Sequence, residues 1–436
     1  MKKILFSFSL LLISVITLMS CADGDRIDQK GGMGIPLEPT IVNVKSVPGG
    51  AVIKIAIPDD PNLKGVVATY ERNGVTCESR ISRYLDTLVV EGYADESEHE
   101  VSIRSFNADD AKSEAQIVKI TPLEAPVKTA KFEAFESFGG IKIRITDNPT
   151  LAKLALVVQC DQNNADQDLA YSERKWKDVS TFFTESNSVV VSRRGLEAVP
   201  TVFAFHFRDD FGNVSETQLV KLTPKEEVAL NKKLCKHYPV ADDNFKNDTG
   251  GGGVAALFDG VYNGGGKFFL AAKGNPIPTW LTIDLGQEAS ISRIATKPRW
   301  DYMPFQSGNV REWEFWGSDV DPVEDYKNNP AKKDDADYQS RHGFSRGWFM
   351  IAKGEQYKPS GYAPDGTVDG FTSEDRDYYL NSTEYECDNT NPLTPRAFDK
   401  IRYLRIVVVN TFESWQFKQT SGGWFIGEIS PYGQIY

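Results

Sequence analysis

The clearest strand signal in the chain is Trp280-Leu281-Thr282-Ile283-Asp284-Leu285-Gly286. Its apolar side chains alternate with Thr282 and Asp284, and this period of two is typical of a β-strand that buries one face. The same alternation returns at residues 311–318 and 403–409, so several such strands are expected in this part of the chain. Three glycines are expected to punctuate the strand ends: Gly286, Gly317 and Gly433.

Three of these segments resemble, in this order, the discoidin domain, also called the coagulation factor V/VIII C-type domain: W-L-T-I-D-L-G, R-E-W-E-F-W-G-S and Y-L-R-I. The resemblance covers residues 236–436. It implies a jelly-roll β-sandwich of the kind shared by galactose-binding and family 32 carbohydrate-binding modules, and it leaves the ligand open because function in such a fold lies in the loops. A long insertion at 320–395 separates the expected strands. Its length suggests a functional or mobile segment, and its many aromatic residues argue against disorder.

Residues 1–20 have the features of a lipoprotein signal peptide. Lys2 and Lys3 precede an apolar stretch, and Leu-Met-Ser-Cys at 18–21 resembles the bacterial lipobox, which implies cleavage before Cys21 and lipidation of its thiol. A transmembrane helix is the alternative, but the apolar run is short for one and no basic flank follows it. The acidic residues after Cys21 resemble the surface-export signal of Bacteroidetes lipoproteins. We therefore expect an outer-membrane, lipid-anchored protein that faces the cell exterior.

After a glycine-rich tether at 21–35, two copies of one unit are expected at residues 36–123 and 124–226. They end in S-E-A-Q-I-V-K-I-T-P and S-E-T-Q-L-V-K-L-T-P, and seven of these ten positions are identical. A repeat of about 100 residues indicates duplicated domains, because a solenoid has a shorter period of ~20–50 residues. Short alternating strands in both copies predict β-sandwiches. The copies resemble fibronectin type III domains, so the whole chain is expected to be all-β.

The composition limits the classes of partner. The formal net charge of −12 is spread along the chain, and the sequence has no basic cluster of the kind that binds nucleic acid. The four cysteines other than Cys21 are scattered, without the C-x-x-C spacing of a zinc site. The sequence leaves open whether Cys235 and Cys387 form a disulfide or remain free thiols, since sequence alone does not set the distance between two cysteines.

Seven of the eight tryptophans lie within residues 236–436, and three of them stand near expected loops with polar neighbours. An aromatic ring stacks on the apolar face of a sugar, while Arg, Asp, Asn or Gln side chains bind its hydroxyls. This combination predicts a glycan-binding site made by Arg299, Trp300, Asp301, Tyr302, Arg346, Trp348, Trp415 and Gln416. The alternative for each tryptophan is ordinary packing within a loop.

The discoidin resemblance also implies a structural calcium site, at Asp259 and Glu428. The alternative is an Asp-Gly turn and a surface glutamate.

Gly-Phe-Ser-Arg-Gly at 343–347 matches the G-x-S-x-G nucleophile pattern, with His342 beside it. That pattern needs a strand before the serine and a helix after it, and neither is expected here, so we interpret the match as chance. Without another catalytic constellation, the chain is not expected to be an enzyme.

The sequence therefore predicts a non-catalytic surface lipoprotein that binds polysaccharide or oligosaccharide through residues 236–436. The two fibronectin-like units would act as spacers. This domain order resembles accessory lipoproteins of Bacteroidetes polysaccharide-utilisation systems, which retain glycans near an outer-membrane transporter. The alternative is a protein-interaction or adhesion module that binds such a transporter, a partner lipoprotein or a host protein.

Overall fold

The structure is a computed structural model and describes residues 34–246, 252–261, 268–299, 304–364, 366–368, 370–381 and 383–436. The signal peptide and Cys21 lie outside the described residues. The chain is all-β, as the sequence predicts, and antiparallel sheets form three consecutive units. In the described part, no helix has both the length and the apolar character needed to cross a membrane.

The first unit, called the first sandwich below, consists of two sheets with the strand orders β1-β2-β5 and β4-β3-β6-β7. The strands are β1 (Thr40–Val47), β2 (Gly50–Ala56), β3 (Gly65–Arg72), β4 (Val75–Ser82), β5 (Thr87–Glu91), β6 (His99–Phe106) and β7 (Gln116–Ile120). Side chains alternate between the two faces of each strand, so Ile53 and Val66 meet, fully buried, between the sheets.

The second unit, the second sandwich, repeats this topology strand for strand, with the orders β8-β9-β12 and β11-β10-β13-β14. Its elements are α2 (Pro126–Thr129), β8 (Lys131–Ser137), β9 (Gly140–Thr146), β10 (Leu154–Asp161), β11 (Lys177–Thr184), β12 (Val189–Arg194), β13 (Thr201–Asp209) and β14 (Gln218–Leu222). The duplication and the sandwich architecture expected from the sequence are both present.

The C-terminal unit is organised around one long strand, β19 (Thr279–Lys297), which contains the opening signal. Its first half pairs with β23 (Ile401–Thr411), and its second half pairs with β26 (Glu428–Ile435). The register shifts between Asp284 and Ala289, and Gly286 has a φ of 68°, so the strand bends there from one layer into the other. The core between the layers receives from β19 the side chains of Leu281, Ile283, Leu285, Ile291 and Ile294.

The remaining strands extend these layers. They are β15 (Val228–Ala229), β16 (Lys236–His237), β20 (Val310–Ser318), β21 (Phe349–Glu355) and β22 (Thr383–Glu386), with the short pairs β17 (Phe269–Leu270) and β25 (Phe425–Ile426), and β18 (Asn275–Pro276) and β24 (Ser421–Gly422). The helices are α3 (Pro322–Asn328), α4 (Ser373–Leu380) and α5 (Phe412–Phe417). Because β15 already pairs with β26, the unit begins ahead of the predicted start at residue 236.

The insertion at 320–395 contributes β21 and β22, which pair with β20 and β19. One sequence expectation about this unit needs correction. Gly317 and Gly433 lie inside β20 and β26, so the prediction that they punctuate strand ends is wrong. The physical reason is a close approach of backbones: a Cβ atom at Gly433 would lie 2.0 Å from the carbonyl oxygen of Ser290.

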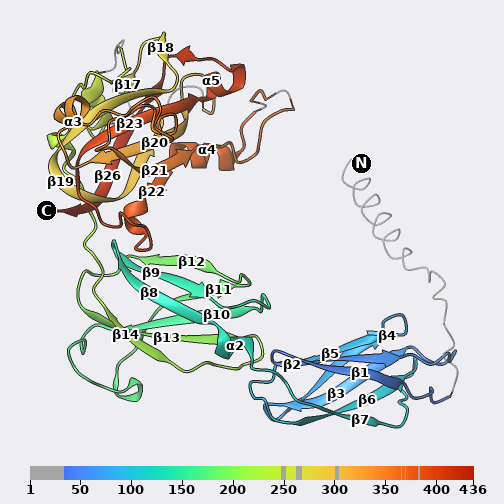
Figure 1. The fold of residues 1–436 in the computed structure, drawn as a ribbon. Helices are drawn as coiled ribbons and strands as arrows, with labels where there is room; N and C mark the ends of the chain where they lie inside the picture. Colours follow the sequence, from blue (N-terminus) through green and yellow to red (C-terminus); the bar gives the residue numbers. More distant parts are fainter. Residues whose placement is uncertain are drawn as a thin grey trace, which may run out of the picture.

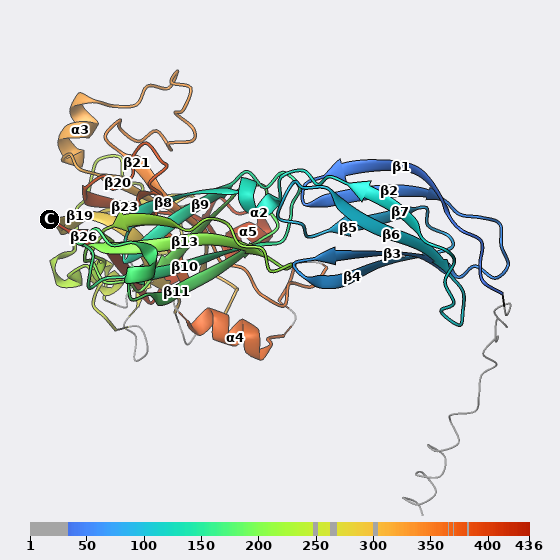
Figure 2. The same ribbon diagram turned by 90° about the horizontal axis from the view of Figure 1, so that it is seen from below.

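In each sandwich, the first hairpin is hydrogen-bonded to the segment that leads into the next unit. The Gly49 N–H of the first sandwich donates to the Leu123 carbonyl at 2.9 Å, and the Gly139 N–H of the second donates to the Lys225 carbonyl at 2.8 Å. Figures 1 and 2 show the resulting arrangement, with the C-terminal unit stacked on the second sandwich and the first sandwich extending to the side.

The joint between the second sandwich and the C-terminal unit is filled by charged and aromatic side chains. Lys142 is 6% exposed, and its Nζ donates to Thr390 Oγ1 at 3.2 Å. Phe138 is fully buried and meets Phe398 edge-on, with ring centres 5.4 Å apart. Glu227 pairs with two guanidinium groups, one from each side of the joint. These contacts fix the second sandwich and the C-terminal unit relative to each other.

Candidate functional site

The end of the C-terminal unit that points away from the second sandwich carries β17, β18 and α5 (Figure 1). Arg299, just beyond the end of β19, lies against the residues around β17 and β25. Its guanidinium carbon is 3.8 Å from the ring centre of Phe268 and 5.5 Å from that of Phe425, which are cation–π contacts. The neighbouring residues predicted for this site, Trp300, Asp301 and Tyr302, lie outside the described residues.

Helix α5 places Trp415 at the same end. Thr411 and Ser414 form a capping box, in which the Ser414 N–H donates to Thr411 Oγ1 at 3.0 Å and the Thr411 N–H donates to Ser414 Oγ at 2.8 Å. This cap fixes where the helix begins and therefore where Trp415 lies. The ring of Trp415 is half-buried, and the guanidinium carbon of Arg311 lies 4.3 Å from its centre. Gln416, also half-buried, follows it on the helix.

A buried tyrosine connects Arg299 to α5. Tyr379 is 2% exposed, and its hydroxyl oxygen lies 2.7 Å from the Arg299 carbonyl oxygen and 2.8 Å from Asn309 Oδ1. The Asn309 carbonyl accepts a hydrogen bond of 3.0 Å from the N–H of Phe412, the first residue of α5. Arg299 and Trp415, far apart in sequence, are thereby held at one end of the sandwich.

The sequence missed three residues that shape this end: Arg311, Tyr362 and Tyr379. Arg311 forms ion pairs with Glu312 and Glu355, and these hold its guanidinium across Trp415. The sequence does hold a signal for Arg311. Strict alternation with Trp313 and Phe315 would place this cation on the buried face of β20, where a charged side chain is unexpected. A register shift between Glu312 and Trp313 lets it leave that face. The ring centres of Tyr362 and Trp415 are 5.4 Å apart. Burial raises the pKa of the Tyr362 hydroxyl.

Trp348 does not have the exposed placement expected for it, whereas Arg346 is exposed. Trp348 is 1% exposed, and the guanidinium carbon of Arg405 lies 4.4 Å from its ring centre, so its ring is not open to a ligand. The prediction of an exposed Trp348 is wrong because the insertion folds back over the outer face of the sheet. Arg346 forms ion pairs with Asp335 and Asp337 of the same insertion. The loop-packing alternative describes Trp348 correctly.

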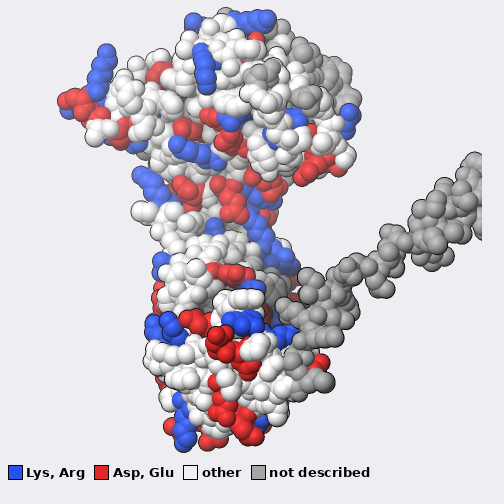
Figure 3. All heavy atoms as spheres, turned by 90° about the vertical axis from the view of Figure 1, so that its right-hand side faces the viewer, with Lys and Arg blue, Asp and Glu red and all other residues white. Residues whose placement is uncertain are grey.

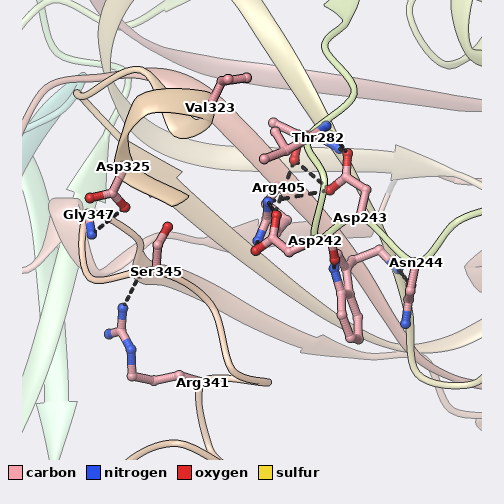
Figure 4. A network of polar contacts seen from close by, with 12 residues as sticks. Asp242, Asp243, Asn244, Thr282, Val323, Asp325, Arg341, Ser345, Gly347 and Arg405 are labelled. Carbon is pink, nitrogen blue, oxygen red and sulfur yellow. Dashed lines mark hydrogen bonds and ion pairs between the residues drawn. The ribbon is translucent and has the colours of Figure 1, made fainter. Parts of the chain in front are cut away.

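A buried guanidinium anchors this cover (Figure 4). Arg405 has no exposed surface, and its Nη1 and Nη2 donate to the two carboxylate oxygens of Asp242 at 2.9 and 2.8 Å. Its Nε donates to Thr282 Oγ1 at 3.1 Å, and Asp243 adds a second carboxylate at 3.4 Å. Burial raises the pKa of Asp243. A buried cation needs such complete pairing, so we interpret this network as structural.

The G-x-S-x-G segment does not form a nucleophile elbow. Ser345 is 1% exposed and follows a run of turns rather than a strand, and its buried hydroxyl has no hydrogen-bond partner among the described residues. The nearby His342 instead places its Nε2 2.9 Å from Glu314 Oε2. The serine and histidine are therefore not arranged as nucleophile and base.

The predicted calcium residues meet in space, but their donors do not suit the ion. Glu428 is 3% exposed; its Oε2 accepts from the Gly260 N–H at 2.9 Å, and its Oε1 lies 2.5 Å from Lys232 Nζ. Asp259 Oδ1 accepts from the Val261 N–H at 2.7 Å, as in an Asp-Gly turn. Calcium needs several free oxygen ligands, whereas both oxygens of Glu428 already accept from N–H groups. Within the described residues, no group of three or more His, Cys, Asp or Glu could hold a metal.

The four described cysteines, including Cys235 and Cys387, are free thiols, so the disulfide alternative is wrong. Burial raises the pKa of Cys235 to about 12 and raises that of Cys387 as well, so both stay protonated at neutral pH.

Figure 3 shows Lys and Arg interspersed with Asp and Glu over one face of the molecule, without a continuous area of either sign.

Family models of known domains match most of the chain in three consecutive segments. Each is described as a domain of unknown function: DUF4959 at residues 36–122, DUF5126 at 121–233 and DUF5000 at 258–433. No curated protein matches the chain.

Several solved structures are similar to the chain. A SusE-like protein is 25% identical, and the match covers 71% of this chain and 100% of that one with a TM-score of 0.41. The C-terminal domain of a chitobiase from Bacteroides fragilis is 15% identical over 48% and 99% of the two chains, with a TM-score of 0.28. A family 32 carbohydrate-binding module from Clostridium perfringens NanJ, solved with galactose, is 13% identical over 47% and 98%, with a TM-score of 0.26.

Proposed function

We propose that the chain is a non-catalytic lipoprotein of the outer-membrane surface, and that it binds polysaccharide or oligosaccharide through the distal end of its C-terminal unit. The observation that carries this proposal is the placement of Arg299 and Trp415 at one end of the sandwich, connected through Tyr379 and Asn309. Because Tyr379 is buried and α5 is capped, both groups stand on a rigid base.

The chemistry of this end suits a sugar ring. Trp415 offers an aromatic face for the C–H groups of a pyranose, while the Gln416 amide and the guanidinium groups of Arg299 and Arg311 can bind hydroxyls. Trp300, Asp301 and Tyr302 enter the proposal on the sequence alone, as the residues that directly follow Arg299. Arg346 and Trp348 are left out of it.

The order of the units supports a surface role. Lipidation at Cys21 would hold the chain on the outer membrane, and the first and second sandwiches lie between that residue and the C-terminal unit. The distal end points away from the second sandwich (Figure 1), which leaves it accessible to a long glycan. A glycan retained there would be available to a neighbouring outer-membrane transporter.

Affinity electrophoresis tests the function. The full mature chain is run through gels that each contain one polysaccharide, and at least one neutral polysaccharide is expected to retard it. Trp415→Ala should weaken that binding about fivefold, since one stacked ring contributes about 1 kcal/mol. Tyr84→Ala is the matched control, because Tyr84 is 85% exposed but lies in the first sandwich.

Two outcomes would contradict the proposal. Retardation by no polysaccharide would overturn glycan binding, and capture of a membrane protein from an outer-membrane extract by the same chain would then favour the protein-interaction alternative. Retardation that Trp415→Ala and Arg299→Ala leave unchanged would place the site elsewhere.

A further inference from the structure

We propose that the second sandwich carries a second saccharide-binding site, on the segment of residues 162–176 that joins β10 to β11. This inference rests on the proposed function for the class of ligand, but it concerns another unit and other residues. It begins from a difference between the repeats. In the first sandwich, β3 and β4 are joined by only Asn73 and Gly74, whereas the same connection in the second sandwich is the whole of residues 162–176.

The segment is rigid although it contains only one short 3₁₀ turn, Tyr171–Glu173. Arg174 is its centre, with a side chain 4% exposed. Its guanidinium donates to three carbonyl oxygens of the segment, those of Leu169 at 3.1 Å, Asn164 at 3.0 Å and Gln167 at 2.7 Å. The same group pairs at 3.4 Å with Asp161, whose side chain is 1% exposed. A buried ion pair with this many backbone acceptors fixes the path of the chain.

The fixed segment presents two aromatic rings. Tyr171 and Trp176 are stacked, with ring centres 5.0 Å apart and an interplanar angle of 25°. The Trp176 Nε1 donates to the Tyr171 carbonyl at 2.8 Å, and the Tyr171 hydroxyl donates to Gln159 Oε1 at 2.9 Å. Each ring is therefore fixed by a side-chain hydrogen bond, yet Tyr171 remains 39% exposed and Trp176 is half-buried. A rigid pair of this kind contributes little to a core and offers a flat face to solvent.

The groups around the rings can bind the hydroxyls of a sugar. Gln159 borders the pair and donates from its amide to Asp178 Oδ1 at 2.9 Å, so an amide and a carboxylate stand beside the aromatic face. Arg174 is neutralised by Asp161, and the Glu173 carboxylate accepts the Ala170 N–H at 2.8 Å. An aromatic face bordered by an amide and a carboxylate fits a saccharide ring with its hydroxyls at the rim.

The position of the segment relates it to the distal site. Residues 162–176 leave β10 at Asp161, which is the end of the second sandwich that also carries Ser137 and Lys142, the residues in contact with Thr390. The second sandwich and the C-terminal unit form one rigid joint there, so the two sites keep a constant separation. A long glycan that spans both sites would gain affinity by multivalency, whereas a short oligosaccharide would not.

The test uses the full mature chain and the polysaccharide that retards the wild type most strongly, with its shortest bound oligosaccharide as a second probe. Tyr171→Ala/Trp176→Ala should weaken binding of the polysaccharide at least about fivefold. The same change in a Trp415→Ala background should abolish the remaining retardation. Arg174 is left intact so that the segment keeps its fold, and an unchanged Tm of the transition that includes the second sandwich verifies this.

A spectroscopic readout keeps the proposal testable if the double variant unfolds. Trp176 is the one tryptophan outside residues 236–436, so Trp176→Phe assigns its signal in ¹⁹F NMR of fluorotryptophan-labelled protein. Addition of the oligosaccharide should shift the Trp176 signal in the wild type and also in Trp415→Ala.

Each outcome separates this inference from the proposed function. If only Trp415→Ala weakens binding and the Trp176 signal does not move, the second site is wrong and the distal site stands. If only Tyr171→Ala/Trp176→Ala weakens binding and the signal moves, the second site stands and the distal site is wrong. A chain that binds no polysaccharide overturns both.

Discussion

The first and second sandwiches have the same strand order but different connections after their third strands. Asn73 and Gly74, with φ values of 51° and 73°, form a tight hairpin in the first sandwich. In the second, residues 162–176 form an ordered segment around Arg174 that displays Tyr171 and Trp176. The sheets are alike, so the two sandwiches share one frame and differ in the connection on which we propose the second site.

The joint that follows the first sandwich also differs from the joint that follows the second. Ala125 and Glu227 occupy corresponding places, each two residues after the carbonyl that binds the first hairpin of its sandwich. The first joint is apolar at this point, because Ala125 is 2% exposed. The second joint holds the Glu227 carboxylate between Arg194 and Arg293. We infer that the second joint is the more rigid one, since paired charges need a defined geometry.

The largest effect is expected from Arg174→Ala in the second sandwich. The change leaves the Asp161 carboxylate buried without its cation and should cost about 3 kcal/mol of that unit's free energy of unfolding. Arg72→Ala in the first sandwich is the matched variant, because Arg72 lies over Phe211 at 4.7 Å but is only half-buried. It should cost about 1 kcal/mol or less. Scanning calorimetry measures both, and equal losses would contradict the comparison.

Much of this frame could be predicted from the sequence. The alternation in Trp280–Gly286 identified β19, and the S-E-x-Q-x-V-K-x-T-P repeat identified the duplicated sandwiches. These features are local, so they can be read from spacing alone. The alternation also separated Leu404 and Ile406, which face the main core, from Arg405 on the other face of β23.

The rest depended on long-range contacts. Trp348 has the polar neighbours of a binding residue, but its burial follows from Arg405, which arrives on another strand. The β21 and β22 segments became strands because β20 and β19 offered them edges to pair with. Tyr171 and Trp176 carry no local signal of a site, because only the fold shows that Arg174 holds the segment around them. No local pattern encodes such partners.

A smaller effect is expected from Glu227→Ala at the second joint. The wild-type second sandwich and C-terminal unit should unfold in one calorimetric transition, because their joint is buried and ion-paired. Glu227→Ala leaves Arg194 and Arg293 without this shared partner. It should lower the free energy of unfolding of the two joined units by about 1–2 kcal/mol. The substitution should also separate the single calorimetric transition into two. Ala125→Ser at the first joint is the matched control, and a single unchanged transition in Glu227→Ala would refute the rigid joint.

The smallest effect concerns a pair found only in the first sandwich. Asp95 is bonded to Ser97 and His99, and these hydrogen bonds lower the pKa of its carboxyl to about 2. The stabilisation is present above the unfolded pKa of about 3.9 and is lost as the pH falls through about 2. Asp95→Asn should therefore cost less than about 1 kcal/mol at pH 7, since the pair is exposed.

The pH dependence checks this last prediction. The difference in unfolding free energy between wild type and Asp95→Asn should shrink between pH 4 and pH 2, and it should appear in the transition of the first sandwich only. A difference that stays constant with pH would mean that the Asp95 carboxylate contributes nothing through its charge.

We propose above that the distal end of the C-terminal unit binds glycan through Trp415 and Arg299. Calorimetric titration of the full chain with a retarding polysaccharide, for the wild type and Trp415→Ala, tests it most directly. We expect an affinity about fivefold lower in the variant, or about 1 kcal/mol, with an unchanged Tm of the transition that includes the C-terminal unit. An unchanged affinity, or a loss of affinity that follows a large fall in Tm, would contradict it.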